Sequence, residues 1–285
     1  MQDVETARKR AALSKSVRAY FDSMDFIEVE TPVRIEAPAP ESHIDCPPVA
    51  TGGFLRASPE LQMKKLLAAG FEKIYQMGPC FRDGERGSRH NPEFTMLEWY
   101  RKDADWRDIA RDLEGLASRL GAEFGNERFR SPPRRISVRD AYLRFAGWDP
   151  FADWDRDRFD EDMALKIEPA LAAEGGGVFL RGYPPEVASL SLVSGGVAER
   201  WEFYFDGLEL ANCFTELCDG AEQSRRFEAE RAERARLGEA DYPVDVGFLA
   251  SVDAIGSAAG VALGIDRLAM ALFGAKDISS VRFFA

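Results

Sequence analysis

The feature that most constrains the fold of this chain is a succession of short segments with strand-like alternation. Within residues 198–205, the aromatic side chains of Trp201, Phe203 and Phe205 share one face, and the polar Glu202 shares the other with Tyr204. Further strands are predicted at residues 26–31, 73–81, 95–100, 178–183, 190–193, 209–217 and 261–263. Strands in such number, flanked by helices, predict an α+β fold built on an antiparallel sheet.

Helices are predicted wherever apolar residues recur at helical spacing, as in the stripe Leu13, Val17, Tyr20 and Met24 within residues 6–24. The other predicted helices cover residues 60–69, 105–120, 135–145, 159–173, 223–237 and 265–273. Residues 36–53 are rich in proline and glycine, and they form either a mobile loop over a site or a simple connection. Because no linker or repeat interrupts the chain, we expect residues 1–285 to form a single domain.

Charge and composition argue against several classes of protein. Acidic residues (49) outnumber basic ones (37), and a net charge of -12 argues against general nucleic-acid binding, which requires a basic surface. No apolar run has the length of a membrane span or the pattern of a secretion signal, so we expect no membrane association. The cysteines form no C-x-x-C pair and only two histidines accompany them, so we expect no structural zinc and a cytoplasmic location.

A polar loop between the predicted strands at 73–81 and 95–100 carries Arg82, Arg86 and Arg89. A guanidinium group binds phosphate oxygens in a fork, so three arginines near one hairpin can hold a polyanion. An ordinary surface hairpin is the alternative, and charge alone does not exclude it.

Two carboxylates lie in the stretch ELANCFTE, at Glu209 and Glu216. Acidic residues near a strand end can bind Mg²⁺ carried by a nucleotide, or a cationic substrate. However, these positions differ by an odd number, so a regular strand would place them on opposite faces. A bulge or strand end near Asn212 must intervene if both serve one site. Taken alone, this stretch favours two solvated carboxylates.

The segment GVALGIDRLAMAL at residues 260–272 runs from a strand of small residues into a helix. Gly264 at the junction lets a ligand approach the backbone closely. Arg267 lies in the first helical turn, where a cation opposes the helix dipole, and this position is sensible if Arg267 reaches an anion. The alternative is an ordinary surface arginine.

In this order, the last three stretches resemble motifs 2 and 3 of the class II aminoacyl-tRNA synthetases. Residues 26–32, FIEVETP, resemble motif 1, whose proline lies at the dimer interface in that family. The resemblance is greatest to the lysyl branch, and it rests on SPELQMKKLL at 58–67, RHNPEFTMLEWY at 89–100 and GLELANCFTEL at 207–217.

Lysyl-tRNA synthetases carry an N-terminal anticodon-binding domain, for which this sequence leaves no room before the motif 1-like segment. A catalytic domain alone resembles the elongation factor P–lysine ligases, which activate (R)-β-lysine with ATP and transfer it to a lysine side chain of elongation factor P. Ala262 stands where lysyl-tRNA synthetases have glycine and these ligases have alanine, a difference associated with a preference for β-lysine over lysine.

The resemblance implies a homodimer that uses ATP and Mg²⁺, with elongation factor P and not tRNA as its partner. Arg82 and Arg267 would be the catalytic residues, on the α- and γ-phosphates. The other residues implied in ATP binding are Asp83, Gly84, Asn91, Glu209, Leu210 and Gly264. Those implied in binding β-lysine or lysine are Ser58, Pro59, Glu60, Tyr100, Glu216 and Ala262, of which Tyr100 and Glu216 receive the side-chain amine. Glu209 and Glu216 would bind Mg²⁺.

The sequence departs from the family pattern in motif 2, where Gly84 stands at the position of a glutamate and Glu85 follows it. Three alternatives stay open: a lysine-activating enzyme with another acceptor, tRNA included; a catalytically silent regulatory paralogue; and an ammonia-dependent asparagine synthetase. The presence of Arg82, Glu209, Glu216 and Arg267 argues against the silent paralogue. The lysyl-type motif 2, together with Glu216, argues against asparagine synthetase.

Overall fold

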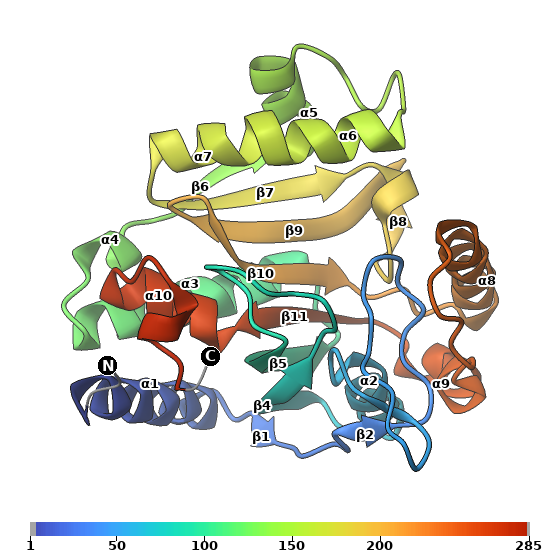
Figure 1. Cartoon of the computed structure of the whole chain (residues 1–285), viewed down its shortest axis with the longest axis horizontal. Coiled ribbons are helices and arrows are strands. Elements are labelled where there is room, and N and C mark those ends of the chain that lie inside the picture. Colours follow the sequence, from blue (N-terminus) through green and yellow to red (C-terminus); the bar gives the residue numbers. More distant parts are fainter. Residues whose placement is uncertain (1–3, 284–285) are drawn as a thin grey trace.

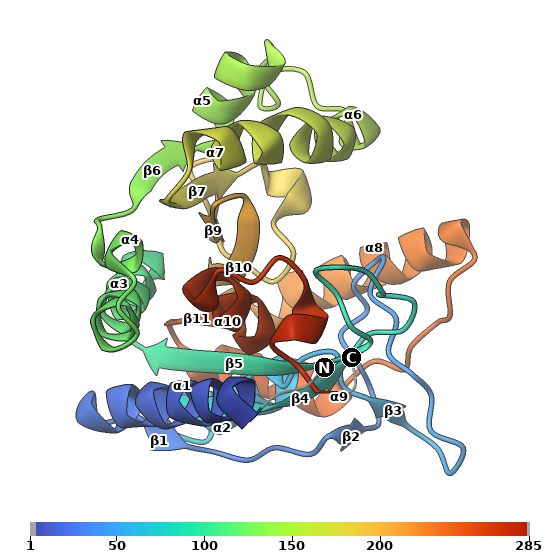
Figure 2. The same cartoon turned by 60° about the vertical axis from the view of Figure 1, so that its left-hand side comes forward.

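The computed structural model of the chain describes residues 4–283 and is built around one large sheet (Figures 1 and 2). Nine strands form this sheet in the order β1-β4-β5-β11-β10-β9-β7-β6, with β8 paired to β9. A separate pair consists of β2 (Arg34–Ile35) and β3 (Phe54–Leu55). The strands of the large sheet are β1 (Ile27–Glu28), β4 (Lys73–Phe81), β5 (Glu93–Lys102), β6 (Arg134–Ser137), β7 (Gly177–Tyr183), β8 (Val193–Ser194), β9 (Val197–Phe205), β10 (Leu208–Thr215) and β11 (Ala258–Gly264).

Helices surround this sheet. The α-helices are α1 (Val4–Ser23), α2 (Glu60–Ala68), α3 (Trp106–Glu123), α4 (Glu127–Arg130), α5 (Val138–Ala141), α6 (Arg156–Asp162), α7 (Glu168–Glu174), α8 (Gly220–Leu237), α9 (Val246–Ser251) and α10 (Ile265–Phe273). Two π-helical segments extend α5 and join α6 to α7, and short 3₁₀ turns lie at Pro185–Val187, Val252–Ile255 and Ile278–Ser280. Among the described residues, no helix combines the length and the apolar character needed to cross a bilayer.

The predicted α+β fold is confirmed, but the sheet is mixed and not wholly antiparallel. β1 pairs with β4 in parallel, and β6 pairs with β7 in parallel, at the two edges of the sheet. The chain passes through helices between the two strands of each pair, and parallel neighbours need such a crossover where antiparallel neighbours need only a turn. The central strands are antiparallel, as predicted.

Most predicted elements agree with the structure, and the exceptions are local. The helix expected at 135–145 is replaced by strand β6, followed by α5 and a π-helical segment. Of the strand expected at 190–193, only Val193 lies in a strand, because the chain turns at Ser189 and Leu190 and Ser191 forms only an isolated bridge with Glu216. The extended segment at 26–31 contributes only the two residues of β1.

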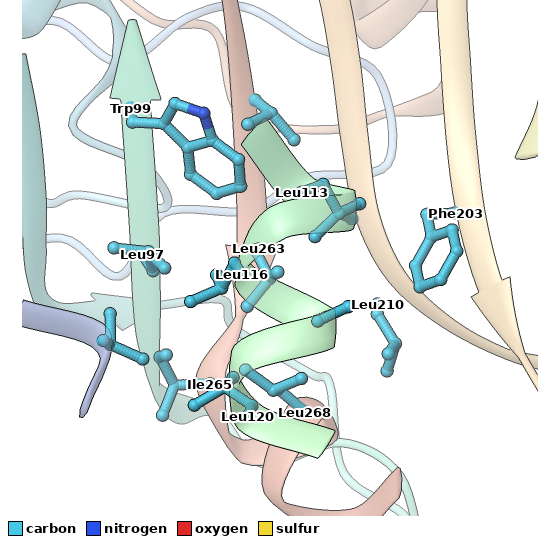
Figure 3. Packing of buried hydrophobic residues seen from close by; sticks show 14 of the residues in the cluster. Leu97, Trp99, Leu113, Leu116, Leu120, Phe203, Leu210, Leu263, Ile265 and Leu268 are labelled. Atoms are coloured by element: carbon cyan, nitrogen blue, oxygen red, sulfur yellow. The ribbon is translucent and has the colours of Figure 1, made fainter. Parts of the chain in front are cut away.

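One face of the sheet carries the largest core. α1, α3 and α10 pack there, and Leu113, Leu116 and Leu120 of α3 contact the sheet beside Leu97 and Leu263 (Figure 3). The other face is covered in two places. One cluster lies beneath α5 to α7, and another lies between α2, α8 and α9. The helices therefore leave the middle of this second face open, and the candidate site lies there.

Candidate active site

The open part of the second face holds a cavity of about 280 Å³. Its floor is formed by pairs of residues directly opposite each other on β5, β11 and β10. Gly260 lies between Tyr100 and Phe214, and Ala262 lies between Glu98 and Asn212. Gly264 continues this strip of small residues towards Arg267. The predicted small-residue strand therefore keeps the floor low enough for a ligand to lie on it.

Position 260 requires a glycine because the Tyr100 ring occupies the space that a side chain would need. A methyl group on Gly260 would lie 2.1 Å from Cδ1 and 2.2 Å from Cε1 of Tyr100, so the ring rests directly on the glycine. The atoms nearest to a methyl group on Gly264 would be those of the Arg267 side chain, at 3.8 Å or more, which is ordinary contact. The floor is thus filled by a protein side chain beside Gly260 and is free beside Gly264.

One end of the cavity is a buried cluster of carboxylates. Ser58 donates a hydrogen bond to Glu98 (2.6 Å), and Tyr100 donates another to the second oxygen of Glu98 (3.0 Å). Lys64 lies between two further carboxylates, 2.6 Å from Glu60 and 2.5 Å from Glu216. Both Glu98 and Lys64 are almost completely buried. This end of the cavity joins α2, β5 and the end of β10.

This carboxylate cluster is poised to accept a cation. Burial raises the pKa of Glu98 to about 7, and the nearby Glu60 carboxylate adds to the rise. Burial also raises the pKa of Glu216, while Lys64 opposes that shift. Burial alone would lower the pKa of Lys64, but Glu216 and Glu60 raise it, so the ammonium stays charged. Glu60 and Glu216 thus share the Lys64 ammonium, whereas Glu98 accepts hydrogen bonds from neutral hydroxyls and has no cation paired with it. A second ammonium would stabilise the ionised form of these carboxylates.

The other end of the cavity carries basic residues, as expected for an anion site. Arg267 donates to the backbone oxygen of Glu209 (3.0 Å), and the ion pair between Arg267 and the Glu209 carboxylate measures 3.2 Å. The Arg82 guanidinium lies over the ring of Phe94, 5.3 Å from its centre. Burial and the neighbouring Arg267 lower the pKa of His90, so this ring stays neutral near pH 7. Arg267 is thus held by Glu209, Arg82 rests on Phe94, and both arginines face the same cavity.

A bulge resolves the alternation problem in β10. The register between β9 and β10 shifts between Glu209 and Ala211, so two consecutive residues, Leu210 and Ala211, both pack into the core. Glu209 and Asn212 consequently both line the cavity, and Glu216 lies further along the same face. The sequence requires such an irregularity near Asn212, and the structure places it just before that residue.

Glu209 and Glu216 lie in different electrostatic surroundings. Arg267, Arg82 and Glu202 act on Glu209, whereas Lys64, Glu60 and Glu98 act on Glu216. Mg²⁺ keeps several of its waters and accepts one or two carboxylates besides phosphate oxygens. Glu209 is partly exposed and fits that role, but Glu216 is buried against an ammonium and does not. Among residues 4–283, no three His, Cys, Asp or Glu side chains form a metal-binding group.

Most of the predicted site residues meet in this one cavity. Three do not line it, namely Pro59, Asp83 and Gly84. Gly84 has a positive φ of 76° and forms the turn after Arg82, which explains a glycine in place of the family's glutamate. Glu85 does line the cavity and lies 3.5 Å from Arg82. A carboxylate therefore borders the cavity beside Arg82, one residue later in the chain than the family pattern places it.

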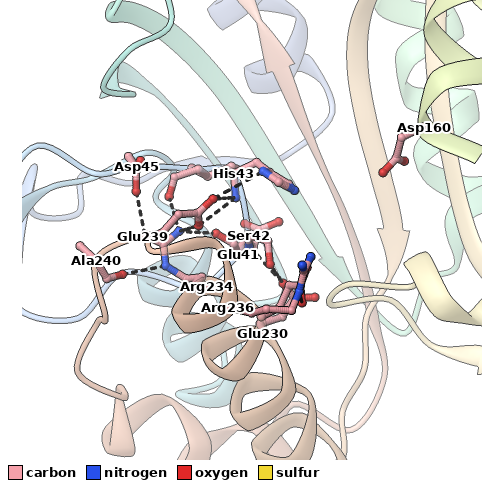
Figure 4. A network of polar contacts seen from close by, with 12 residues as sticks. Glu41, Ser42, His43, Asp45, Asp160, Glu230, Arg234, Arg236, Glu239 and Ala240 are labelled. Carbon is pink, nitrogen blue, oxygen red and sulfur yellow. Dashed lines mark hydrogen bonds and ion pairs between the residues drawn. The ribbon is translucent and has the colours of Figure 1, made fainter. Parts of the chain in front are cut away.

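The loop at 36–53 lies over the site, where Glu41 and Ile44 line the cavity. Arg234 of α8 is fully buried and holds this loop (Figure 4). It donates to the backbone oxygens of Glu41 (2.8 Å) and Ile44 (3.1 Å), and it pairs with Asp45 (2.7 Å). The segment thus lies over the site, as the first alternative expected, but Arg234 from a helix far away in the sequence holds it, and mobility is not supported.

Sequence reasoning missed Lys64, Glu98, Gly260 and Glu41. Glu98 precedes Tyr100 by two residues on a predicted strand, so the shared face was a usable signal. Gly260 lies two residues before Ala262, which is the same signal. Lys64 follows Glu60 at i+4 and looks like an exposed helical pair, and only its contact with Glu216 shows otherwise.

Comparison with known proteins agrees with this geometry. The family model described as tRNA synthetases class II (D, K and N) matches residues 2–285. A protein of Proteus mirabilis (strain HI4320) named elongation factor P–(R)-β-lysine ligase is 36% identical over 97% of this chain and 93% of its own length. Proteins of the same name from Yersinia enterocolitica (35%, covering 97% and 93%) and Photorhabdus laumondii (36%, covering 97% and 94%) are similar. The chain belongs to the class II tRNA synthetase (D, K and N) family and, within it, to the group of elongation factor P–(R)-β-lysine ligases.

Proposed function

We propose that this protein is an ATP-dependent ligase that activates (R)-β-lysine, or lysine, and transfers it to a lysine side chain of elongation factor P. One observation carries the proposal: a single cavity joins a buried, acidic amine site at one end to a basic site at the other. A cationic amino acid and a nucleotide fit these two ends. The printed names of the relatives supply the acceptor, elongation factor P.

The first step is the formation of an aminoacyl adenylate. The substrate carboxylate attacks the α-phosphorus of ATP, a new P–O bond forms, and the bond to pyrophosphate breaks. Arg82 and Arg267 hold and neutralise the phosphates, while Asn91, Leu210 and Gly264 border the nucleotide. Mg²⁺, which Glu209 would hold, supplies further neutralisation of phosphate charge. Because neither reactant needs a protein nucleophile, positioning and charge supply the catalysis.

The side-chain ammonium group of the substrate is held at the buried, acidic end of the cavity. Tyr100 and Glu216 present oxygens to it, Glu98 acts from behind through its hydrogen bond with Tyr100, and Ser58 and Glu60 border the other amino group. Ala262 lies directly opposite Glu98 on the neighbouring strand, so its methyl narrows the floor beside the carboxylate. One methyl group is worth about 1–3 kcal/mol in substrate discrimination, which is enough to favour the β-amino isomer by roughly tenfold or more.

We also propose that the chain acts as a single catalytic domain in a homodimer, with no tRNA substrate. Support for the dimer comes from β1, which forms one edge of the sheet and leaves the Ile27 side chain 53% exposed. An unpaired edge with an exposed apolar residue is a surface that a second copy can cover. The substitution Ile27→Asp is expected to convert the dimer to a monomer in light scattering, and an unchanged mass would contradict this interface.

The test of the proposed function is ATP–pyrophosphate exchange with (R)-β-lysine, with lysine and with no amino acid. Exchange that depends on β-lysine supports the proposal, a preference for lysine favours the tRNA-synthetase alternative, and no exchange with either favours a silent paralogue. The substitution Arg267→Ala is expected to abolish exchange without unfolding the protein. Arg111→Ala is the control, because Arg111 is 67% exposed on α3 and pairs with Asp108 on the same helix. Near-normal exchange by Arg267→Ala would refute the phosphate role.

A further inference from the structure

A second cavity of about 290 Å³ adjoins the active site. We call it the acidic chamber. It lies over β7 and β9 and is bordered by α6, by Glu186 after β7, and by Glu230 of α8. Glu41, Arg200 and Glu209 line both this chamber and the active-site cavity, so the two spaces meet at these residues. The acidic chamber therefore borders the active-site cavity on a side other than its amine and phosphate ends.

The lining of the acidic chamber is strongly negative. Seven carboxylates border it against two guanidinium groups. The two arginines are already paired: Arg156 lies 2.9 Å from Asp160, and Arg200 lies 2.6 Å from Glu202. Four of the remaining carboxylates make no ion pair with a basic side chain within residues 4–283, and only Glu209 pairs with Arg267. The four unpaired carboxylates are Glu41, Glu168, Glu186 and Glu230.

A second observation concerns a buried hydroxyl group in the acidic chamber. Tyr183 lines the acidic chamber and is 2% exposed, and its hydroxyl lies near Glu202. Even so, this hydroxyl makes no hydrogen bond of good geometry with any described residue. A buried hydroxyl without a partner costs free energy unless another group supplies the hydrogen bond. The chamber thus offers both negative charge and an unused hydrogen-bonding group.

Glu41 stands at the junction of the two cavities. Its carboxylate accepts a hydrogen bond from Ser189 (3.3 Å), and the adjacent Ser42 donates to Glu230 (2.6 Å). Figure 4 shows Asp160 of α6 on the far side, directed towards this loop. The charges acting on Glu41 come from the amine end (Glu60), the phosphate end (Arg82) and the chamber. Burial, with Glu60 adding to it, raises the pKa of Glu41 to about 7, so its carboxyl can exchange a proton at neutral pH.

We propose that the acidic chamber is the route by which the acceptor lysine, carried on a basic segment of its protein, reaches the adenylate, with Glu41 at the end of the route. This inference rests on the proposed function. The amine and phosphate ends of the cavity hold the adenylate, so the acceptor must enter elsewhere. A chamber with unpaired carboxylates attracts an ammonium group and orders the side chain behind it.

The transfer step then balances as follows. The lysine ammonium gives one proton to the Glu41 carboxylate, and the freed nitrogen attacks the carbonyl carbon of the adenylate. A C–N bond forms, the C–O bond to the phosphate breaks, and AMP leaves with that electron pair. The new amide nitrogen loses its second proton to solvent.

The test separates the two half-reactions. Glu186→Gln, Glu230→Gln and the double variant remove charge from the chamber while the glutamine at 230 keeps an oxygen for Ser42. Glu228→Gln on the same helix is the control, because Glu228 is exposed and does not line the chamber. We measure pyrophosphate exchange with β-lysine, and then the modification of purified elongation factor P by mass spectrometry at low and high salt.

We expect exchange within about twofold of wild type in every variant, and a fall of about tenfold or more in kcat/KM for elongation factor P in the double variant. High salt should narrow that difference. Undiminished transfer by the double variant, with exchange intact, overturns the entry route alone. An equal loss of exchange and transfer also overturns it, because the chamber would then serve the first half-reaction. Absence of exchange in the wild type overturns the proposed function and the route with it.

Discussion

Substitution of Gly260 by alanine should damage the amine site through Tyr100. The added methyl would lie 2.1 Å from the Tyr100 ring, so the ring must retreat by about 1.3 Å to reach an ordinary 3.4 Å contact. Tyr100 is 3% exposed and has little room to move. Overpacking of this kind costs about 1–3 kcal/mol, and loss of the hydrogen bond from Tyr100 to Glu98 (3.0 Å) adds about 1 kcal/mol. We therefore expect Gly260→Ala to lower the free energy of unfolding by about 2–4 kcal/mol.

The assay combines urea unfolding with the KM for the amino acid in pyrophosphate exchange. Gly260→Ala should raise this KM more than the KM for ATP, because Tyr100 lies at the amine end. Gly264→Ala is the matched control on the same strand, since its methyl meets nothing closer than 3.8 Å and its stability should stay within about 0.5 kcal/mol of wild type. If Gly260→Ala unfolds like wild type and keeps its KM, the inference that Tyr100 is held by this glycine is wrong.

Three further predictions concern the charged residues. Glu216→Gln should raise the KM for the amino acid far more than that for ATP, and equal increases would mean that Glu216 serves the metal instead. Arg234→Ala should lower the free energy of unfolding by about 3 kcal/mol in urea, because a buried cation with five partner residues is lost, whereas Arg236→Ala on the exposed side should change it by less than about 0.5 kcal/mol. Glu98 has a pKa of about 7 in the fold, above its unfolded value, so wild-type stability is lost as pH rises from about 4.3 to 7. Glu98→Gln should therefore gain stability relative to wild type between pH 5 and pH 8 in urea unfolding, and parallel pH profiles would contradict that pKa.

The sequence predicts the elements whose burial repeats regularly. β4 and α10 agree with their predicted bounds because their apolar residues follow a clear period. β6 was missed because Arg134 and Arg135 are exposed on an edge strand, so no alternation marks it. α9 was missed because six residues are too few to show a helical period, and the burial of Phe248 against α2 and α8 forms it instead.

In the candidate site too, residues that belong to a local sequence pattern were predicted, and residues that depend on tertiary contacts were not. Arg82, Glu209 and Arg267 could be found because each belongs to a local pattern in one segment. The partners of Glu98 and Lys64 could not, because they depend on which strands and helices are neighbours. Glu98 meets Ser58 from the segment before α2, and Lys64 meets Glu216 from the end of β10. A single sequence does not specify such pairings across the sheet.

The position of β11 sets the order in which this protein can assemble. β11 is the strand that joins β1-β4-β5 to β10-β9-β7-β6, so without it the sheet is two separate pieces. Ala258 is synthesised 156 residues after Lys102, the end of its neighbour β5. At roughly 5–20 residues per second, the ribosome adds those residues in about 8–30 s. Throughout that interval the two halves of the cavity cannot meet, so a nascent chain cannot begin to consume ATP. Division of the chain after β5 would give two fragments that meet where β5 pairs with β11, and activity should return only when they reassociate.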